Sequence, residues 1–283
     1  TFISLDVAEG ESKTTEKLTG IPKLEAGNSY TYKLTVGKNK VSVSGISVAP
    51  WNTGTITDNG KAELYAPYVT FKADGEQTFE LIAYGDYSNS RLEYSVNNDK
   101  WQEVEACRLI TFGGINGDLR LRGTNTNGTA TDDSNYLCFI FLKNNVDVAC
   151  TGDIRTLLNW RNHKTVETQN ARFCNLFENC NVLTSAPELP ATTLANDCYR
   201  GMFFGCTKLS TVTMLAPSTE IASKSNCFNF WLYNAGTEAN SRILKVQDAA
   251  AYTALESYLP DNWKKGDTGA TVTYKVDEEK NIE

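Results

Sequence analysis

The chain has 283 residues, of which 41% are hydrophobic and 22% charged, and its formal net charge at pH 7 is −7. This length allows one large or two smaller domains with a substantial buried core. Acidic residues outnumber basic ones by 34 to 27 and no cluster of Lys and Arg is present, which argues against a nucleic-acid partner. The longest apolar run, residues 137–142, fits a buried strand and is too short to span a membrane.

Residues 1–60 have the sequence pattern of β-strands. Apolar and polar residues alternate over 2–7, 29–36 and 41–46, and the turn residues 37–40 predict that the last two strands form a hairpin. Residues 53–61 are rich in Thr, Gly and Asn and are expected to be a linker.

Residues 61–150 contain a second group of strand patterns. The runs are short, closely spaced and separated by Gly, Asn and Asp, which predicts an antiparallel β-sandwich. The polar segment 123–135 is expected to be an exposed loop. The strands are expected at 68–72, 78–83, 92–96, 101–104, 109–112, 119–121 and 136–142.

An imperfect repeat occupies the C-terminal part. The segments LFENC at 176–180, MFFGC at 202–206 and WLYNA at 231–235 align with steps of 26 and 29 residues. A period in the twenties indicates strand-plus-helix units, which must stack because one unit alone cannot bury its apolar face.

The helix of one unit is expected over residues 191–203. Leu194, Cys198 and Met202 recur every four residues and would share one face, and Gly205 suits the helix end.

Strands of the repeat are expected at 183–189 and 209–215, where β-branched residues alternate with others. A further strand is expected at 243–246, followed by a closing helix 249–258 with Asp248 as its N-cap. A final strand is expected over 271–276, before an acidic, disordered tail.

The segment LTSAPELPATTLANDCYRGMFFGCTKL, residues 183–209, resembles the BspA-type leucine-rich repeat of surface proteins from Bacteroides and related bacteria. The resemblance covers roughly residues 150–263, with about two full units and a degenerate third. Residues 24–32 and 48–52 resemble the C-terminal part of fimbrillin-like domains from the same bacteria. The resemblance implies a short array that adheres to host proteins or other cells.

We therefore expect a multi-part α+β protein. Residues 1–60 are a strand segment resembling the end of a fimbrillin-like domain, and 61–150 form a β-sandwich domain. Residues 151–276 form a short leucine-rich-repeat solenoid with a C-terminal cap, and 277–283 are a tail.

The eight cysteines allow disulfides because their number is even. We favour free thiols for those in the repeat, since equivalent side chains of stacked units point the same way and a disulfide needs a specific mutual geometry. No CxxC pair is present, so a zinc site is not expected.

No residue pattern indicates catalysis. The single histidine, His163, is expected in an exposed loop, and no GxSxG nucleophile motif accompanies it. Residues 95–101 faintly resemble an Asp-box hairpin but are better explained as an ordinary hairpin.

The carboxylate pairs Glu103 with Glu105 and Asp132 with Asp133 are expected on solvated surfaces rather than around a sugar-cleaving site. Calcium binding by Asp132, Asp133 and Asn135 remains an alternative. We predict neither a cofactor nor an enzyme.

Aromatic residues are the strongest binding candidates, because sugars and protein partners both use exposed aromatic rings as anchors. Tyr199, Phe204, Trp231 and Tyr233 lie in the repeat. Phe204 and Tyr233 are expected to show an edge outside, whereas Met202, Phe203 and Leu232 should face the core. A core position for the four candidates is the alternative.

The predicted function is non-catalytic adhesion or ligand binding through a rigid repeat face. The expected partner is a host extracellular-matrix protein or a surface glycan, and the expected location is the cell surface or outer membrane, through a lipid anchor outside this chain. Two alternatives stay open. The first is a pilus-associated structural subunit that pairs its N-terminal strands with other subunits. The second is a glycan-binding accessory protein of a polysaccharide-utilisation system.

Overall fold

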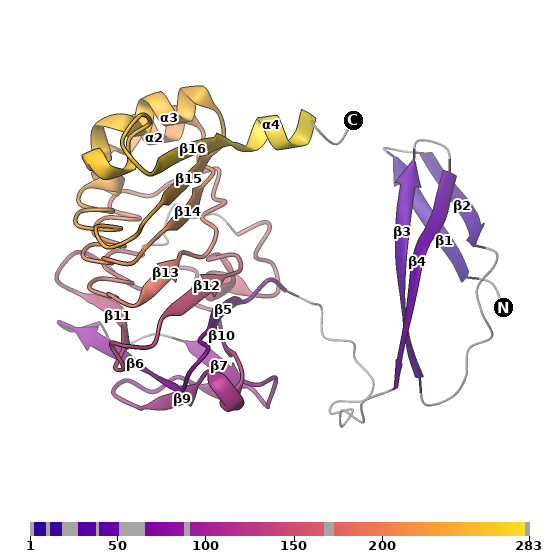
Figure 1. Ribbon diagram of the computed structural model, residues 1–283, viewed down its shortest axis with the longest axis horizontal. Helices are drawn as coiled ribbons and strands as arrows, with labels where there is room; N and C mark the ends of the chain where they lie inside the picture. The colour runs from indigo at the N-terminus through magenta and orange to yellow at the C-terminus, as the bar shows by residue number, and fades with distance from the viewer. Residues whose placement is uncertain are drawn as a thin grey trace. The chain divides into compact units, whose positions relative to one another are not determined.

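The computed structural model describes residues 3–9, 12–18, 28–37, 40–50, 66–87, 91–166 and 173–280. The chain divides into two compact units, Thr1–Glu63 and Leu64–Glu283 (Figure 1). The expected linker at 53–61 lies outside the described residues.

Two β-hairpins make up the described part of the first unit. Strand β1 (Ile3–Glu9) pairs antiparallel with β2 (Ser12–Leu18), and β3 (Asn28–Gly37) pairs antiparallel with β4 (Lys40–Pro50). The hairpin predicted from the alternation around residues 37–40 is confirmed.

The second unit is built on a mixed sheet of nine strands in the order β16-β15-β14-β13-β12-β5-β10-β7-β8, with a three-stranded sheet β11-β6-β9. Pairing is antiparallel from β8 to β12 and parallel from β12 to β16. The strands are β5 (Val69–Lys72), β6 (Gln77–Tyr84), β7 (Leu92–Val96), β8 (Gln102–Glu103), β9 (Ile110–Phe112), β10 (Leu119–Gly123), β11 (Tyr136–Phe141), β12 (Val148–Thr151), β13 (Leu183–Ser185), β14 (Thr211–Met214), β15 (Arg242–Val246) and β16 (Ala270–Tyr274).

This arrangement corrects the predicted fold class. The expected β-sandwich and strand-plus-helix solenoid are not separate structures, because β12 pairs with β5 on one side and with β13 on the other. One sheet therefore continues from the N-terminal strands of the unit into the repeat. Residues on both sides of position 150 also share one hydrophobic core.

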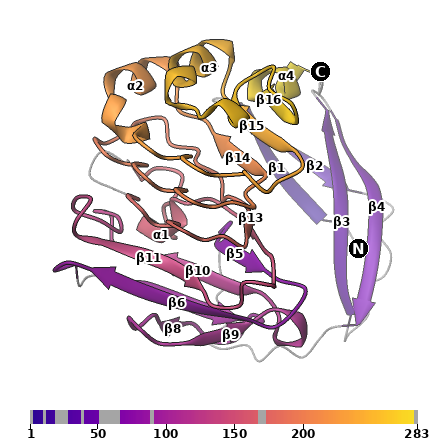
Figure 2. The same ribbon diagram turned by 60° about the vertical axis from the view of Figure 1, so that its left-hand side comes forward.

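Helices are few and short among the described residues, and none of them is long and apolar enough to cross a bilayer. Helices α2 and α3 pack together near the C-terminal strands (Figure 2). The Asp248 carboxylate caps α3 by accepting a hydrogen bond from the backbone N–H of Ala251 at 2.8 Å, as the sequence indicated. The helices are α1 (Thr156–Asn159), α2 (Ser218–Ser223), α3 (Ala249–Leu255), α4 (Lys275–Lys280) and the 3-10 segments η1 (Gly114–Asn116), η2 (Ser225–Phe228), η3 (Glu256–Tyr258) and η4 (Asp261–Trp263).

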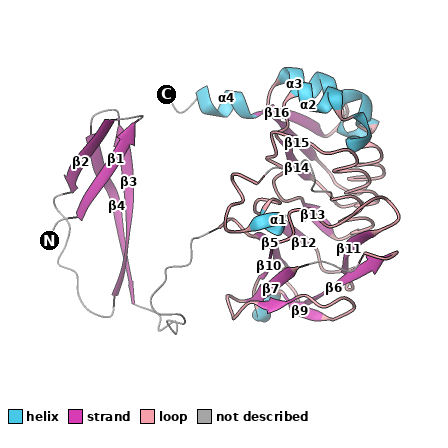
Figure 3. Ribbon diagram, turned by 180° about the vertical axis from the view of Figure 1, so that it is seen from behind, coloured by secondary structure: helices cyan, strands magenta, loops and turns pink. Residues whose placement is uncertain are grey.

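One helix prediction and one prediction of disorder are wrong. Residues 191–203 do not form a helix; the chain there runs in consecutive turns, which Figure 3 draws as loops opposite the strands. The segment after 276 was expected to be disordered, yet α4 continues through Lys280.

Three stacked turn segments replace the expected helices: the first at 173–180, the second at 198–206 and the third at 227–235. Each contains a left-handed residue at every fourth position, where a right-handed helix is interrupted. These residues are Asn175 and Asn179, then Gly201 and Gly205, then Phe230 and Asn234.

Backbone hydrogen bonds run between the segments rather than along a helix. The Phe177 N–H donates to the Met202 carbonyl at 2.9 Å, and the Phe203 N–H donates to the Trp231 carbonyl at 2.9 Å. This pairing confirms the 26- and 29-residue steps of the repeat, while the secondary structure within it differs from the prediction.

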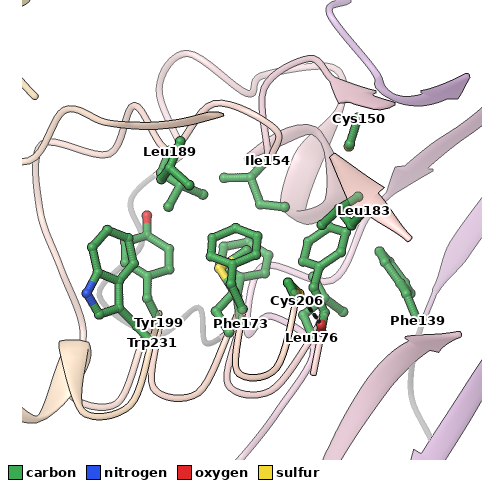
Figure 4. Packing of buried hydrophobic residues seen from close by; sticks show 14 of the residues in the cluster. Phe139, Cys150, Ile154, Phe173, Leu176, Leu183, Leu189, Tyr199, Cys206 and Trp231 are labelled. Atoms are coloured by element: carbon green, nitrogen blue, oxygen red, sulfur yellow. Dashed lines mark hydrogen bonds between the residues drawn. The ribbon is translucent and has the colours of Figure 1, made fainter. Parts of the chain in front are cut away.

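The core is continuous through the second unit (Figure 4). Phe177 of the first turn segment lies 5.2 Å from Phe139 of β11 and 5.4 Å from Phe203 of the second turn segment, measured between ring centroids. Phe177 therefore joins the antiparallel strands to the stacked segments.

All eight cysteines are free thiols, and seven are buried. The Cys206 thiol donates to the Phe177 carbonyl at 3.0 Å, and the Cys180 thiol donates to the Phe139 carbonyl at 2.9 Å. The repeat cysteines thus contact the neighbouring layer's backbone and not each other through a disulfide, as predicted.

Candidate functional site

Three aromatic side chains form a surface feature that we call the aromatic ridge: Phe204, Phe230 and Tyr233. Phe230 is 57% exposed and Tyr233 is 49% exposed, while Phe204 is half-buried. The rings of Phe204 and Tyr233 stack with centroids 5.3 Å apart and planes 18° apart. Phe230 meets Tyr233 edge to face at 6.1 Å.

The turn segments explain why these rings face outward. In the second segment Phe203 is buried and Phe204 follows it toward the surface; in the third, Leu232 is buried and Tyr233 follows it. The core positions predicted for Met202, Phe203 and Leu232 are confirmed.

Phe230 has a backbone conformation that is unusual for a bulky residue. Its φ is +57°, at the position that Gly201 occupies in the preceding segment. Left-handed backbone at a non-glycine residue costs free energy, and such strain is concentrated at functional positions. The exposed ring is therefore a candidate for binding.

Phe230 lines two pockets. The polar pocket, about 340 Å³, is lined by Asp133, Tyr136, Asn175, Glu178, Arg200, Gly201, Phe204 and Phe230. The apolar pocket, about 390 Å³, is lined by Phe228, Asn229, Phe230, Tyr233, Ser257, Tyr258, Leu259 and Pro260.

Charged groups in the polar pocket are already ordered. The Arg200 guanidinium pairs with Asp133 at 2.8 Å and with Asp197 at 3.7 Å. The Tyr136 hydroxyl donates to Glu178 Oε2 at 3.0 Å. Burial, with the nearby Glu178 carboxylate, raises the pKa of Tyr136, so its hydroxyl stays protonated at neutral pH.

Two of the four predicted binding residues lie in the core instead. Tyr199 and Trp231 are 0% exposed. Tyr199 stacks on Phe173 with ring centroids 6.2 Å apart and packs against Phe228, also at 6.2 Å, with its plane tilted by 49°. Trp231 packs against Phe228 at 5.4 Å. An external ligand cannot reach either ring.

Sequence reasoning missed Phe230 and the polar pocket. The available signal for Phe230 was a bulky residue in the register of Gly201. Residues of the pocket come from the loop near 133, from strand β11 and from all three turn segments, so no single stretch of sequence reveals it.

The remaining candidates lie outside the aromatic ridge. His163 was expected in an exposed loop, and that prediction is wrong: its side chain is buried at 7% exposure, whereas the flanking Arg161 and Lys164 are exposed. The Asp132 carboxylate accepts from the backbone N–H groups of Ser134 and Asn135 within its own loop, and these bonds lower the pKa of Asp132.

The other carboxylates and the suspected Asp-box hairpin are also accounted for. Asp133 pairs with Arg200, and Glu103 and Glu105 are exposed. The hairpin turns at Asn97 and Asn98, both left-handed.

A scan against protein-family models and searches of curated proteins and of solved structures found no match. The candidate site therefore rests on its own geometry.

Proposed function

We propose that this chain is a non-catalytic ligand-binding protein whose contact surface is the aromatic ridge with its two flanking pockets. The exposure of Phe230 and Tyr233 carries this proposal. Large exposed aromatic side chains next to a pocket favour recognition, because they bury much apolar area and have few torsions to immobilise.

The backbone under the ridge is well ordered for binding. Hydrogen bonds between turn segments hold both ends of the ridge: the Gly205 N–H donates to the Tyr233 carbonyl at 2.8 Å, and the Gly201 N–H donates to the Asn229 carbonyl at 2.9 Å. A surface that is already ordered loses little conformational entropy when it binds.

The resemblance of the repeat to BspA-type surface proteins supports adhesion as the biological setting. On this proposal the protein is exported and displayed at the cell surface or outer membrane, lipid-anchored through a segment outside this chain. Its partner is an extracellular-matrix protein or a surface glycan.

The test is a binding screen of the full chain against a panel of matrix proteins (fibronectin, fibrinogen, laminin and collagen) and a glycan array. We expect at least one specific hit, weakened about tenfold or more in a Phe230→Ser, Tyr233→Ser double variant, as for interface hot spots. Ile115→Ser with Leu109→Ser is the matched control, since both residues are exposed apolar side chains outside the ridge. No hit, or a hit that the ridge variant binds as tightly as the wild type, would overturn the proposal.

A structural subunit is the second candidate, and strand β16 favours it. Among the described strands β16 pairs only with β15, so its other edge offers unpaired backbone groups. Sedimentation at increasing protein concentration tests this: oligomers that disappear in a Thr273→Pro variant would support it, and a monomer at all concentrations would exclude it.

A further inference from the structure

We infer that the polar pocket binds one residue of a neutral sugar. The inference rests on the proposed ligand-binding function and specifies its ligand class. It is carried by the juxtaposition of two aromatic rings, Phe204 and Phe230, with hydrogen-bonding side chains from three separate segments.

The size of the pocket suits one sugar ring. Its volume of about 340 Å³ lies at the lower end of the ~300–1,000 Å³ found for small-molecule sites. Such a space holds a pyranose together with a few bridging waters, whereas a folded protein surface would contact only its rim.

The aromatic wall matches the apolar face of a pyranose. One face of many hexoses presents several C–H groups, and the electron-rich face of an aromatic ring attracts them. Phe204 is fixed for this role because Tyr233 stacks on it at 5.3 Å. Phe230 provides a second, more exposed ring at the mouth of the pocket.

The polar wall matches hydroxyl groups, which donate and accept at the same atom. Glu178 and Asp133 offer acceptor oxygens, Arg200 offers donors, and the Asn175 amide offers both. The Glu178 Oε2 atom accepts from Tyr136, and the same carboxylate lines the pocket. A pair of adjacent sugar hydroxyls can bridge such a carboxylate and the neighbouring amide.

The charge balance favours a neutral ligand. The Arg200 guanidinium is already compensated by Asp133 and Asp197, so an anionic sugar would meet the Asp133 and Glu178 carboxylates with no free cation among the described residues that line the pocket. A cation such as a lysine or quaternary ammonium would use Glu178 and the rings, but would leave the donors of Arg200 and Asn175 unused.

Saturation-transfer difference NMR of the full chain tests the inference. The probes are methyl α-D-glucopyranoside, methyl α-D-mannopyranoside and methyl β-D-galactopyranoside, with glucuronate and tetramethylammonium as the charged alternatives. We expect saturation of the ring C–H protons of at least one hexoside. We also expect its affinity to fall about tenfold in Glu178→Gln and in Phe204→Ala.

Glu105→Gln is the matched control, because it removes the same charge at an exposed position and should leave hexoside binding unchanged. The inference is overturned if no hexoside is saturated, if Glu178→Gln and Phe204→Ala bind as the wild type does, or if glucuronate or tetramethylammonium binds in preference.

The sugar inference and the proposed function fail in different ways. If the hexosides fail while a matrix-protein hit still depends on Phe230 and Tyr233, the sugar inference falls and the proposed function stands. If no probe and no matrix protein or glycan depends on the ridge, both fall.

Discussion

The Asn175 side chain of the first turn segment lies directly against the α-carbon of Gly201 in the second. A Cβ atom added at Gly201 would be 2.1 Å from Asn175 Oδ1, and the φ of Gly201 is +59°. The same contact recurs one turn further on, where a Cβ at Gly205 would be 2.4 Å from Asn179 Oδ1. The close stacking of these two segments therefore depends on glycine at both positions.

A Gly201→Ala substitution should lower the free energy of unfolding by about 1–3 kcal/mol, because it adds a steric clash to the strain of a left-handed alanine. Urea unfolding followed by circular dichroism measures the change. Gly266→Ala is the control for strain alone, since Gly266 has φ +97° and nothing within 4 Å. Asn175→Gly should stabilise the Gly201→Ala variant more than it stabilises the wild type, because Asn175 is itself left-handed, and the difference between the two effects measures the clash. Equal losses in Gly201→Ala and Gly266→Ala would contradict the contact.

Phe177 should connect the stability of the antiparallel strands to that of the turn segments. Phe177→Ala leaves a cavity between Phe139 and Phe203 and should cost about 3–5 kcal/mol. Hydrogen exchange read by mass spectrometry should show faster exchange in both β11 and β14. Phe230→Ala, at an exposed ring, should change stability by less than about 0.5 kcal/mol. Faster exchange in β14 alone would mean that the two regions unfold separately.

Thiol reactivity should distinguish one cysteine from the rest. Cys107 is exposed and the other seven are buried, so iodoacetamide should modify Cys107 first in the native protein. Mass spectrometry after denaturation without reductant should then find eight alkylated thiols. Cys107→Ser should abolish the fast native reaction, whereas fewer than eight thiols in denaturant would reveal a disulfide.

Stability should fall with rising pH above about pH 9. Burial is the largest effect on both thiols. It raises the pKa of Cys138 to about 12 and the pKa of Cys174 to about 12. An unfolded thiol loses its proton near pH 8.5–9, so between pH 9 and 12 the native state binds more protons than the unfolded state and unfolding becomes easier. Urea midpoints at pH 7, 8.5 and 10 measure this decline, and a Cys138→Ala, Cys174→Ala double variant should show a flatter one. A wild-type midpoint independent of pH would refute the linkage.

Arg242 should be hard to replace even by lysine. Its guanidinium donates to the backbone carbonyls of Asn262, Ala239 and Thr268 at 2.7, 2.7 and 2.6 Å. A lysine cannot reach three separate acceptors with this geometry, so Arg242→Lys should cost about 2–4 kcal/mol through unpaired buried carbonyls. Arg108→Lys, on an exposed pair with Glu105, should cost less than about 0.5 kcal/mol. The melting temperatures of the two variants measure this difference in stability. Equal melting temperatures would contradict the role assigned to Arg242.

The aromatic residues show how much of the candidate site was predictable. The register of the repeat separated Phe204 and Tyr233 from the buried Phe203 and Leu232, because the residue after a core position faces outward in each segment. The same register does not show that Tyr199 is buried, whereas Phe204 and Tyr233 reach the surface. Its burial follows from packing against Phe173 and Phe228, which only the assembled layers provide.

The sequence by itself determined the N-terminal hairpin, the spacing of the repeat, the core positions of Met202, Phe203 and Leu232, and the α3 cap, since these depend on local alternation and side-chain chemistry. Tertiary structure alone decided three further features: the single mixed sheet, the turn segments that replace helices, and the polar pocket beside Phe230. A four-residue spacing of apolar side chains is shared by a helix and by stacked turns. Turns form here instead of a helix for two reasons. Left-handed residues such as Gly201 and Gly205 interrupt a right-handed helix, and their N–H groups donate to carbonyls of the neighbouring segment.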